Sequence, residues 1–186
     1  MRNRKVLMAV LLVLLASAEV AISAADASIL NRGQLAAAEQ SVDARMLKLW
    51  NDNTISLLGQ SRASYFPGTG LVLSAEVTLA TFPGGSLLGD AMTDKDKADL
   101  RKKKIDRLPQ LRTVMKEVMV NLASSLNQIP PTEKIGFSVV IIRYNWEDPN
   151  GLPLQVTMQA TKQELLAAKS AGSAGLDKAI RIVETN

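Results

Sequence analysis

The stretch PQLRTVMKEVMVNLASSLN, residues 109–127, decides the fold because it is the clearest amphipathic segment in the chain. Its apolar side chains recur at spacings of three and four, at Leu111, Val114, Met115, Val118, Met119, Leu122 and Leu126. That spacing predicts a helix with one apolar face, which needs a core to pack against. Pro109 has no backbone N–H and is best tolerated in a first turn, so we expect this helix to open there and to end near Asn127.

Two stretches with strand patterns lie on either side of this helix. Residues 71–81 alternate, with a strongly apolar face at the odd positions and a less apolar face at the even ones. Residues 134–146 are apolar on both faces in the middle, which predicts a central strand covered, at least in part, on both sides. A tight turn over residues 148–151, with Pro149 in second position, then leads into an antiparallel third strand over residues 154–160.

Shorter helices are predicted before and after this core. Residues 34–50 show helical spacing, and a second short helix capped by Asn53 or Thr54 is expected to extend to Arg62. We expect a charged helix to start at Thr93 or Asp94 and Thr161 to cap a helix over residues 162–169. Residues 172–175 are typical of a small-residue linker, and residues 179–183 of either an edge strand or a short helix.

These elements predict one α+β domain over residues 25–171, followed by a tail over residues 172–186. We expect a small antiparallel sheet of three or four strands, packed against the long amphipathic helix and flanked by N-terminal helices.

The first 24 residues are typical of a secretory signal peptide. Arg2, Arg4 and Lys5 precede an apolar run over residues 6–15, and small residues that suit a signal peptidase follow it. The alternative is an uncleaved membrane anchor, which Glu19 disfavours because it interrupts the apolar run well short of the roughly 20 residues that a span needs. We therefore expect an exported protein, periplasmic or secreted, with no transmembrane span once the leader is removed.

The composition excludes several chemistries. The chain has no Cys and no His, so a Cys nucleophile, a Ser-His-Asp triad, a disulfide and a thiolate or imidazole zinc site are all impossible. The basic cluster at residues 101–104 lies among four aspartates, which is typical of a solvated helix face rather than a nucleic-acid surface. We expect no cofactor and no nucleic-acid partner.

The segments at residues 68–77, 146–153 and 158–160 carry a resemblance to a group of exported bacterial proteins of unknown function. Their sequences here are GTGLVLSAEV, WEDPNGLP and MQA. The likeness covers roughly residues 40–165. That group has no established activity, so the resemblance implies export and a shared core, and no reaction.

Three carboxylates are candidates for chemistry. Glu76 lies in mid-strand and needs a partner such as Arg62 or Arg143 if it is buried. Glu147 and Asp148 lie where the second strand is expected to end, and two suitably spaced carboxylates can hydrolyse a glycosidic bond. An oxygen-ligated cation bound by Glu147, Asp148 and Asn150 is a further possibility. Ion-paired strand and turn residues explain the same pattern.

Aromatic residues supply the other candidate. Trp146 and Tyr144 are expected on the same side of a strand, and Tyr65 could complete a small aromatic patch for a partner or ligand. Such residues also commonly close one end of a core. From these observations we expect a non-enzymatic binding or interaction protein with an unknown protein or small ligand as its partner. The alternative is a carboxylate-based hydrolase or a metal-binding protein.

Overall fold

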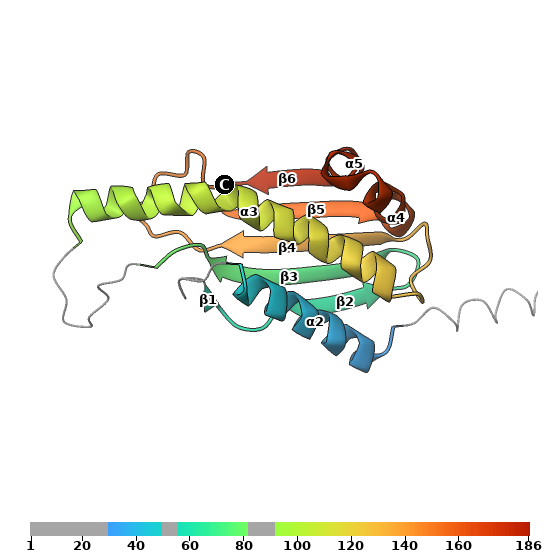
Figure 1. Ribbon diagram of the computed structural model, residues 1–186. Coiled ribbons are helices and arrows are strands. Elements are labelled where there is room, and N and C mark those ends of the chain that lie inside the picture. The colour runs from blue at the N-terminus through green and yellow to red at the C-terminus, as the bar shows by residue number, and fades with distance from the viewer. Residues whose placement is uncertain (1–29, 50–55, 82–91) are drawn as a thin grey trace, which may run out of the picture.

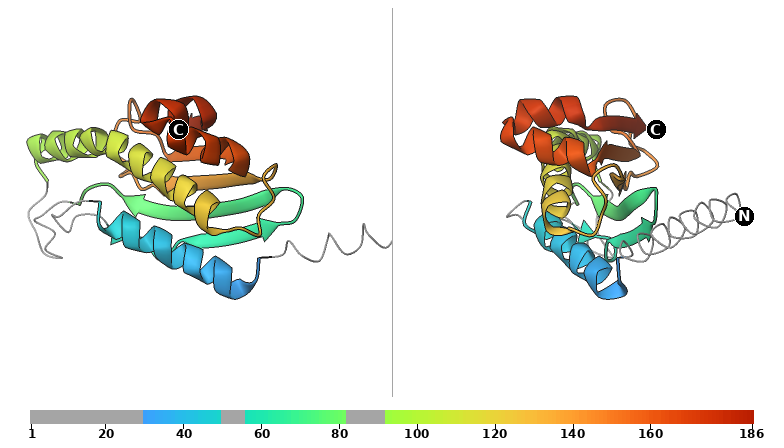
Figure 2. Two further views of the ribbon diagram at one scale, coloured as in Figure 1. Left: turned by 45° about the vertical axis from the view of Figure 1, so that its right-hand side comes forward. Right: turned by 90° about the vertical axis from the view of Figure 1, so that its right-hand side faces the viewer.

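Helices cover one face of a single β-sheet, as the computed structural model shows over the residues it describes, 30–49, 56–81 and 92–186 (Figures 1 and 2). The helices are α2 (Arg32–Leu47), α3 (Asp94–Ser125), α4 (Lys162–Ser170) and α5 (Gly172–Ala179). The strands are β1 (Ser56–Leu57), β2 (Arg62–Phe66), β3 (Gly70–Thr78), β4 (Lys134–Ile141), β5 (Gln155–Thr161) and β6 (Arg181–Thr185). The predicted signal peptide lies outside the described residues.

The α+β class and the long helix are confirmed, but the sheet is larger than predicted and it is mixed. Its order is β1-β3-β4-β5-β6, and β2 pairs with β3 on the same edge as β1. β3 and β4 are parallel, because α3 carries the chain back along the sheet between them, whereas the other pairs are antiparallel. β1 and β6 are too short to show an alternation that identifies a strand.

α3 is longer than predicted, because it is one continuous helix that contains Pro109. The proline was expected to start a new helix, and that expectation is wrong. Both halves of α3 bury residues against the same sheet, and this packing outweighs the local cost of one missing hydrogen bond. The predicted start is confirmed: the hydroxyl of Thr93 accepts from the backbone N–H of Asp96, and the Asp96 carboxylate accepts from the N–H of Thr93.

The core lies between α3 and one face of the sheet. The odd positions of β3 are buried as predicted, and Phe137 of β4 is fully buried with Leu111, Met115 and Met119 of α3. β4 is a central strand, as predicted, but its two faces are not covered equally. Val140 on the face away from α3 is only half-buried, because no described element packs over that face.

Four local predictions have different outcomes. The prediction of a short helix that extends to Arg62 is wrong, because Ser56–Leu57 and Arg62–Phe66 are strands. Its predicted caps, Asn53 and Thr54, lie outside the described residues. The predicted linker at residues 172–175 belongs to α5, and the last segment is an edge strand rather than a helix. α4 starts after Thr161 with a capping box, as predicted.

Gly70 is required by a close approach of two strands. Its φ is +129°, and a Cβ at this position would lie 1.9 Å from the carbonyl oxygen of Lys134. This glycine lets the start of β3 meet the start of β4, whose register begins at Gly70 and Lys134.

Within the three described ranges, no helix combines the length and the hydrophobicity that crossing a bilayer requires.

Candidate binding surface on the β4–β5 loop

The loop between β4 and β5, residues 142–154, brings together four of the predicted site residues: Arg143, Trp146, Glu147 and Asp148. The strand predicted to reach Trp146 ends at Ile141 instead. The chain turns there because the Glu147 side chain points back toward α3, and the Glu147 N–H donates to the Tyr144 carbonyl at 3.0 Å.

A buried ion pair holds this loop. The Lys104 Nζ atom of α3 lies 2.8 Å from the Glu147 Oε2 atom, and both side chains are 0% exposed. The same carboxylate oxygen accepts from the Tyr144 N–H at 2.7 Å, and Lys104 also donates to the Ile142 carbonyl at 3.3 Å. The other oxygen, Oε1, is buried without a hydrogen-bond partner among the described residues. Because two buried charges are costly unless paired, this geometry strongly fixes the position of Glu147 relative to α3.

The Tyr144 ring lies over Lys104 of the ion pair, and the Trp146 ring stacks on Tyr144. The Lys104 Nζ atom is 4.5 Å from the centroid of the Tyr144 ring, within the range of a cation–π interaction. Tyr144 stacks on Trp146 with ring centroids 5.3 Å apart and planes inclined by 6°. The two residues remain 40% and 38% exposed. The ion pair therefore supports an aromatic pair that is presented to solvent.

Two arginines bind the rest of the loop, through hydrogen bonds and an ion pair. Arg101 of α3 donates to the Asn150 carbonyl at 2.5 Å, and it lies 3.4 Å from the Asp148 carboxylate. Arg143 donates to the Leu152 carbonyl at 3.0 Å. The backbone N–H of Asn150 holds the pKa of Asp148 below its ordinary value, and the Asn150 side chain and the charge of Arg101 add to this effect.

The turn at the tip of the loop is shifted by one residue from the prediction. The Leu152 N–H donates to the Pro149 carbonyl, so Pro149 is the first residue of the turn rather than the second. Gly151, with φ +74°, supplies the positive φ in third position.

The remaining predicted residues lie elsewhere. Arg62 and Glu76 line a shallow hollow on the open face of the sheet, on neighbouring strands. Tyr65 is half-buried on β2 opposite Leu71, at the end of β3 that is remote from the loop, so it does not join the Tyr144–Trp146 pair.

The three carboxylates do not converge on one open pocket. Glu76 is exposed on the open face of the sheet, Glu147 is enclosed on the side of α3, and Asp148 is exposed at the loop tip. Within the described segments, no group of three or more acidic side chains is placed to hold a metal ion. This geometry gives no support to the hydrolase or metal-binding alternative.

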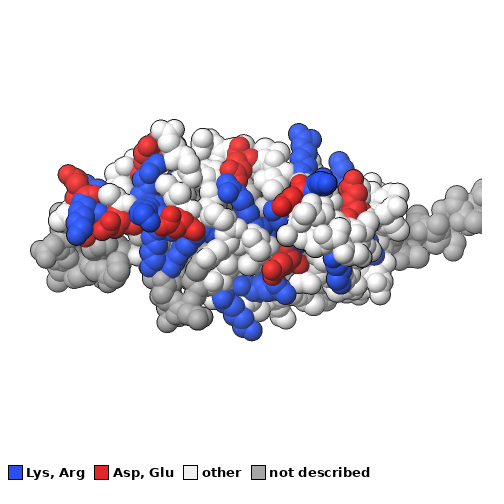
Figure 3. All heavy atoms as spheres, turned by 45° about the horizontal axis from the view of Figure 1, so that its top comes forward, with Lys and Arg blue, Asp and Glu red and all other residues white. Residues whose placement is uncertain are grey.

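Sequence reasoning missed Lys104, because it belongs to a charged run that was expected to be solvated. In that run Lys102 is exposed, and Arg101 and Lys103 are half-buried. Basic and acidic side chains are interspersed over this surface (Figure 3). Lys104 nevertheless lies four residues after Leu100 and four before Leu108, both of which are buried. A single cation in register with an apolar stripe is the signal that could have identified it.

Comparisons with known proteins add no further constraint, since no family model, no curated protein and no solved structure matches this chain.

Proposed function

We propose that this chain is an exported, non-enzymatic binding protein that contacts its partner through the Tyr144–Trp146 pair. The observation that carries the proposal is that a fully buried Lys104–Glu147 ion pair supports two stacked, part-exposed rings. Removing two charges from water costs several kcal/mol per ion before pairing offsets it. A loop that needed only to connect two strands would not require this arrangement.

The surface has the composition of a small interface. Aromatic residues and arginine are enriched at the centres of protein interfaces. Trp146 and Tyr144 supply that centre, and Arg101, Asp148 and Asn150 supply polar groups around it. The partner that suits a stacked indole presents a flat or ring-shaped group, such as a proline or aromatic side chain.

Export rests on the leader pattern of the first 24 residues, which precede the described part of the chain. Absence of Cys and His agrees with a role in binding rather than in nucleophilic or acid–base catalysis, because the commonest side chains for those reactions are lacking.

Affinity capture tests this proposal. The chain without its leader is immobilised and exposed to an envelope extract, beside Trp146→Ala and Leu166→Ala variants. Leu166 is a matched control, because it is 39% exposed but lies on α4. We expect a protein retained by the parent chain and by Leu166→Ala, and lost with Trp146→Ala. A retained protein that is indifferent to Trp146 would contradict the proposed surface.

A further inference from the structure

The hollow on the open face of the sheet brings an acid and a base together without pairing them. Its volume is about 300 Å³, at the lower limit of pockets that bind small molecules. Arg62 and Glu76 both line it and are both exposed, and neither forms an ion pair within the described residues. Arg62 lies opposite Ser74 of β3, and Glu76 is two residues further along, so the two charges are diagonal neighbours. Each charge is therefore available to a ligand.

The hollow exists because β1 and β2 are separate pieces along one edge of β3. β1 lies opposite residues 77–78 and β2 opposite residues 70–74, so residues 58–61 pass beside only two positions of β3. The Leu58 N–H still donates to the Glu76 carbonyl at 3.0 Å. The chain then bends toward α2, where the Ser61 hydroxyl donates to the Glu39 carbonyl at 3.0 Å. This excursion leaves the open face of β3 uncovered beside Glu76.

Helix α2 fixes the backbone on both sides of Arg62. The N–H of Ser61 donates to the Asp43 carboxylate at 2.9 Å, and the N–H of Ala63 donates to the Glu39 carboxylate at 3.0 Å. Successive residues of a strand face opposite sides, so Ala63 is buried under α2 while Arg62 points to the open face. Because its backbone is already held, Arg62 loses less conformational freedom when it binds a ligand.

The other side chains of the hollow add hydrogen-bonding groups and apolar contacts. The Ser74 hydroxyl and the Gln60 amide can each donate and accept beside the two charges. Leu58, which is 50% exposed, and Val140, which lies opposite Glu76 on β4, supply the apolar part. A ligand that matches this lining carries a carboxylate, an ammonium group and a small apolar group.

We infer that the hollow binds a small zwitterion of the amino-acid class, a free amino acid or a short peptide, with its carboxylate on Arg62 and its ammonium on Glu76. A guanidinium matches a carboxylate through two parallel hydrogen bonds, and a carboxylate accepts charge-assisted bonds from an ammonium. Both charges are in contact with water, so each ion pair is weak and the affinity is modest. The site is separate from the Tyr144–Trp146 surface, which lies on the β4–β5 loop.

Titration followed by NMR chemical shifts tests the ligand class, with L-leucine and the dipeptide L-leucyl-L-leucine as probes. We expect saturable binding with a Kd of roughly 1 mM, and the tighter probe shows whether a free amino acid or a peptide is preferred. N-acetyl-leucine and leucine amide each lack one charge and should bind about fivefold more weakly than L-leucine. Absence of saturation by both probes at roughly 20 mM would overturn the inference, as would blocked compounds that bind as tightly as L-leucine.

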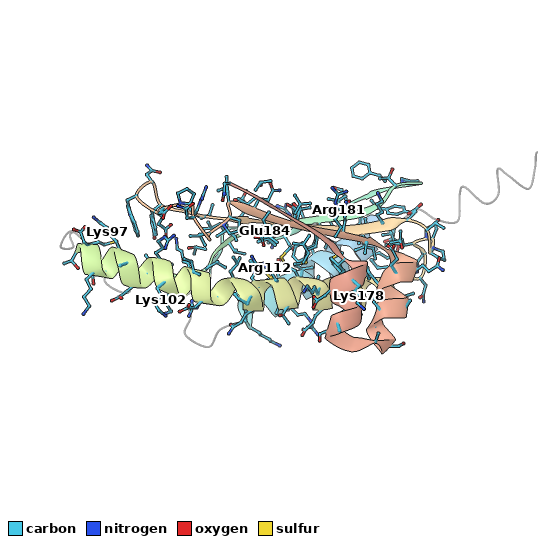
Figure 4. All side chains as sticks on the ribbon, turned by 90° about the horizontal axis from the view of Figure 1, so that it is seen from above. Lys97, Lys102, Arg112, Lys178, Arg181 and Glu184 are labelled. Atoms are coloured by element: carbon cyan, nitrogen blue, oxygen red, sulfur yellow. The ribbon has the colours of Figure 1, made fainter. Side chains whose placement is uncertain are left out.

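Substitutions test the two residues, which are exposed and can be changed without disturbing the core. Arg62→Gln and Glu76→Gln should each weaken binding of the tighter probe by about fivefold. Arg181→Gln is the matched control, because Arg181 is another exposed arginine but lies on β6, at the opposite edge of the sheet (Figure 4). It should leave the Kd unchanged. Binding that is indifferent to Arg62→Gln would overturn the inference.

A charge reversal separates recognition of both charges from a general effect of either substitution. Arg62→Glu places two acids in the hollow and should abolish binding. Arg62→Glu/Glu76→Arg offers both signs again, in exchanged positions, and should recover part of the lost affinity because a zwitterion can bind in the reverse orientation. A double variant that binds no better than Arg62→Glu would overturn the inference.

Discussion

The two halves of α3 bury different kinds of side chain against the same sheet. After Pro109, the buried face is apolar and includes Leu111, Met115 and Met119, all 0% exposed. Before it, the buried face includes Lys104 and Arg107. The comparison teaches that one helix can seal a core with its second half and position a surface loop with its first.

The first half of α3 contacts the sheet and the β4–β5 loop through hydrogen bonds and an ion pair. Lys104 binds Glu147 and the Ile142 carbonyl, and Arg107 donates to the Leu79 carbonyl at 2.8 Å, just beyond β3. Such bonds fix geometry but contribute little net stability, whereas burial of the apolar second half stabilises the fold directly. The halves should therefore respond differently to substitution.

The largest effect is expected from Lys104→Met. This change leaves the Glu147 carboxylate buried without its cation, which typically costs about 3–5 kcal/mol. Urea unfolding measures the loss. Replacing both partners in Lys104→Met/Glu147→Leu should recover most of it, because two apolar side chains of similar volume leave no buried charge. A double variant as unstable as the single one would show that the pair itself supplies the stability.

Leu111→Ala tests the second half. A fully buried leucine lost from a core costs about 2–5 kcal/mol, and no second substitution on the loop should restore it. The same urea measurement applies, with exposed Leu166→Ala as the control, which should cost less than about 1 kcal/mol. A loss below that of the control would mean that the second half of α3 does not seal the core.

The smallest effect is expected at the loop tip, as a dependence on pH. The pKa of Asp148 is lowered in the folded chain, so its contribution is fully present above its ordinary pKa and is lost as pH falls through the lowered value. Acidification through that range should loosen the loop slightly, and Asp148→Asn should remove this step. Amide hydrogen exchange of residues 148–151 measures it. An unchanged pH dependence in Asp148→Asn would assign the step to another group.

Much of the fold follows from patterns that one sequence contains. The spacing of Leu111 to Leu126 predicts the sealing helix, and the alternation over residues 71–81 predicts β3. The continuity through Pro109 could not be predicted, because the packing that tolerates it involves residues distant in sequence. β6 was one of two alternatives, since five residues carry too little alternation to separate a strand from a helix.

The sequence predicted the loop that carries the candidate site, but it did not predict Lys104, the residue that supports the loop. Trp146, Glu147 and Asp148 were candidates by residue type, and they do share one loop. Their partner Lys104 is distant in sequence, and a lysine in a charged run is normally solvated. Glu76 was grouped with the acids of the loop on the condition that the two strands are neighbours. They are neighbours, but Glu76 lies on the open face of the sheet whereas Glu147 is enclosed on the side of α3.

The most direct test of the account is whether the buried pair holds Trp146 in place. Trp50→Phe leaves Trp146 as the one tryptophan in the chain, so its fluorescence reports the loop alone. Acrylamide quenching is compared between this chain and the same chain carrying Lys104→Met/Glu147→Leu, under conditions where both are folded. The account predicts that quenching of Trp146 rises toward the unfolded value when the pair is removed. Equal quenching in the two folded chains would show that the aromatic pair is held without the ion pair, and would contradict the central claim.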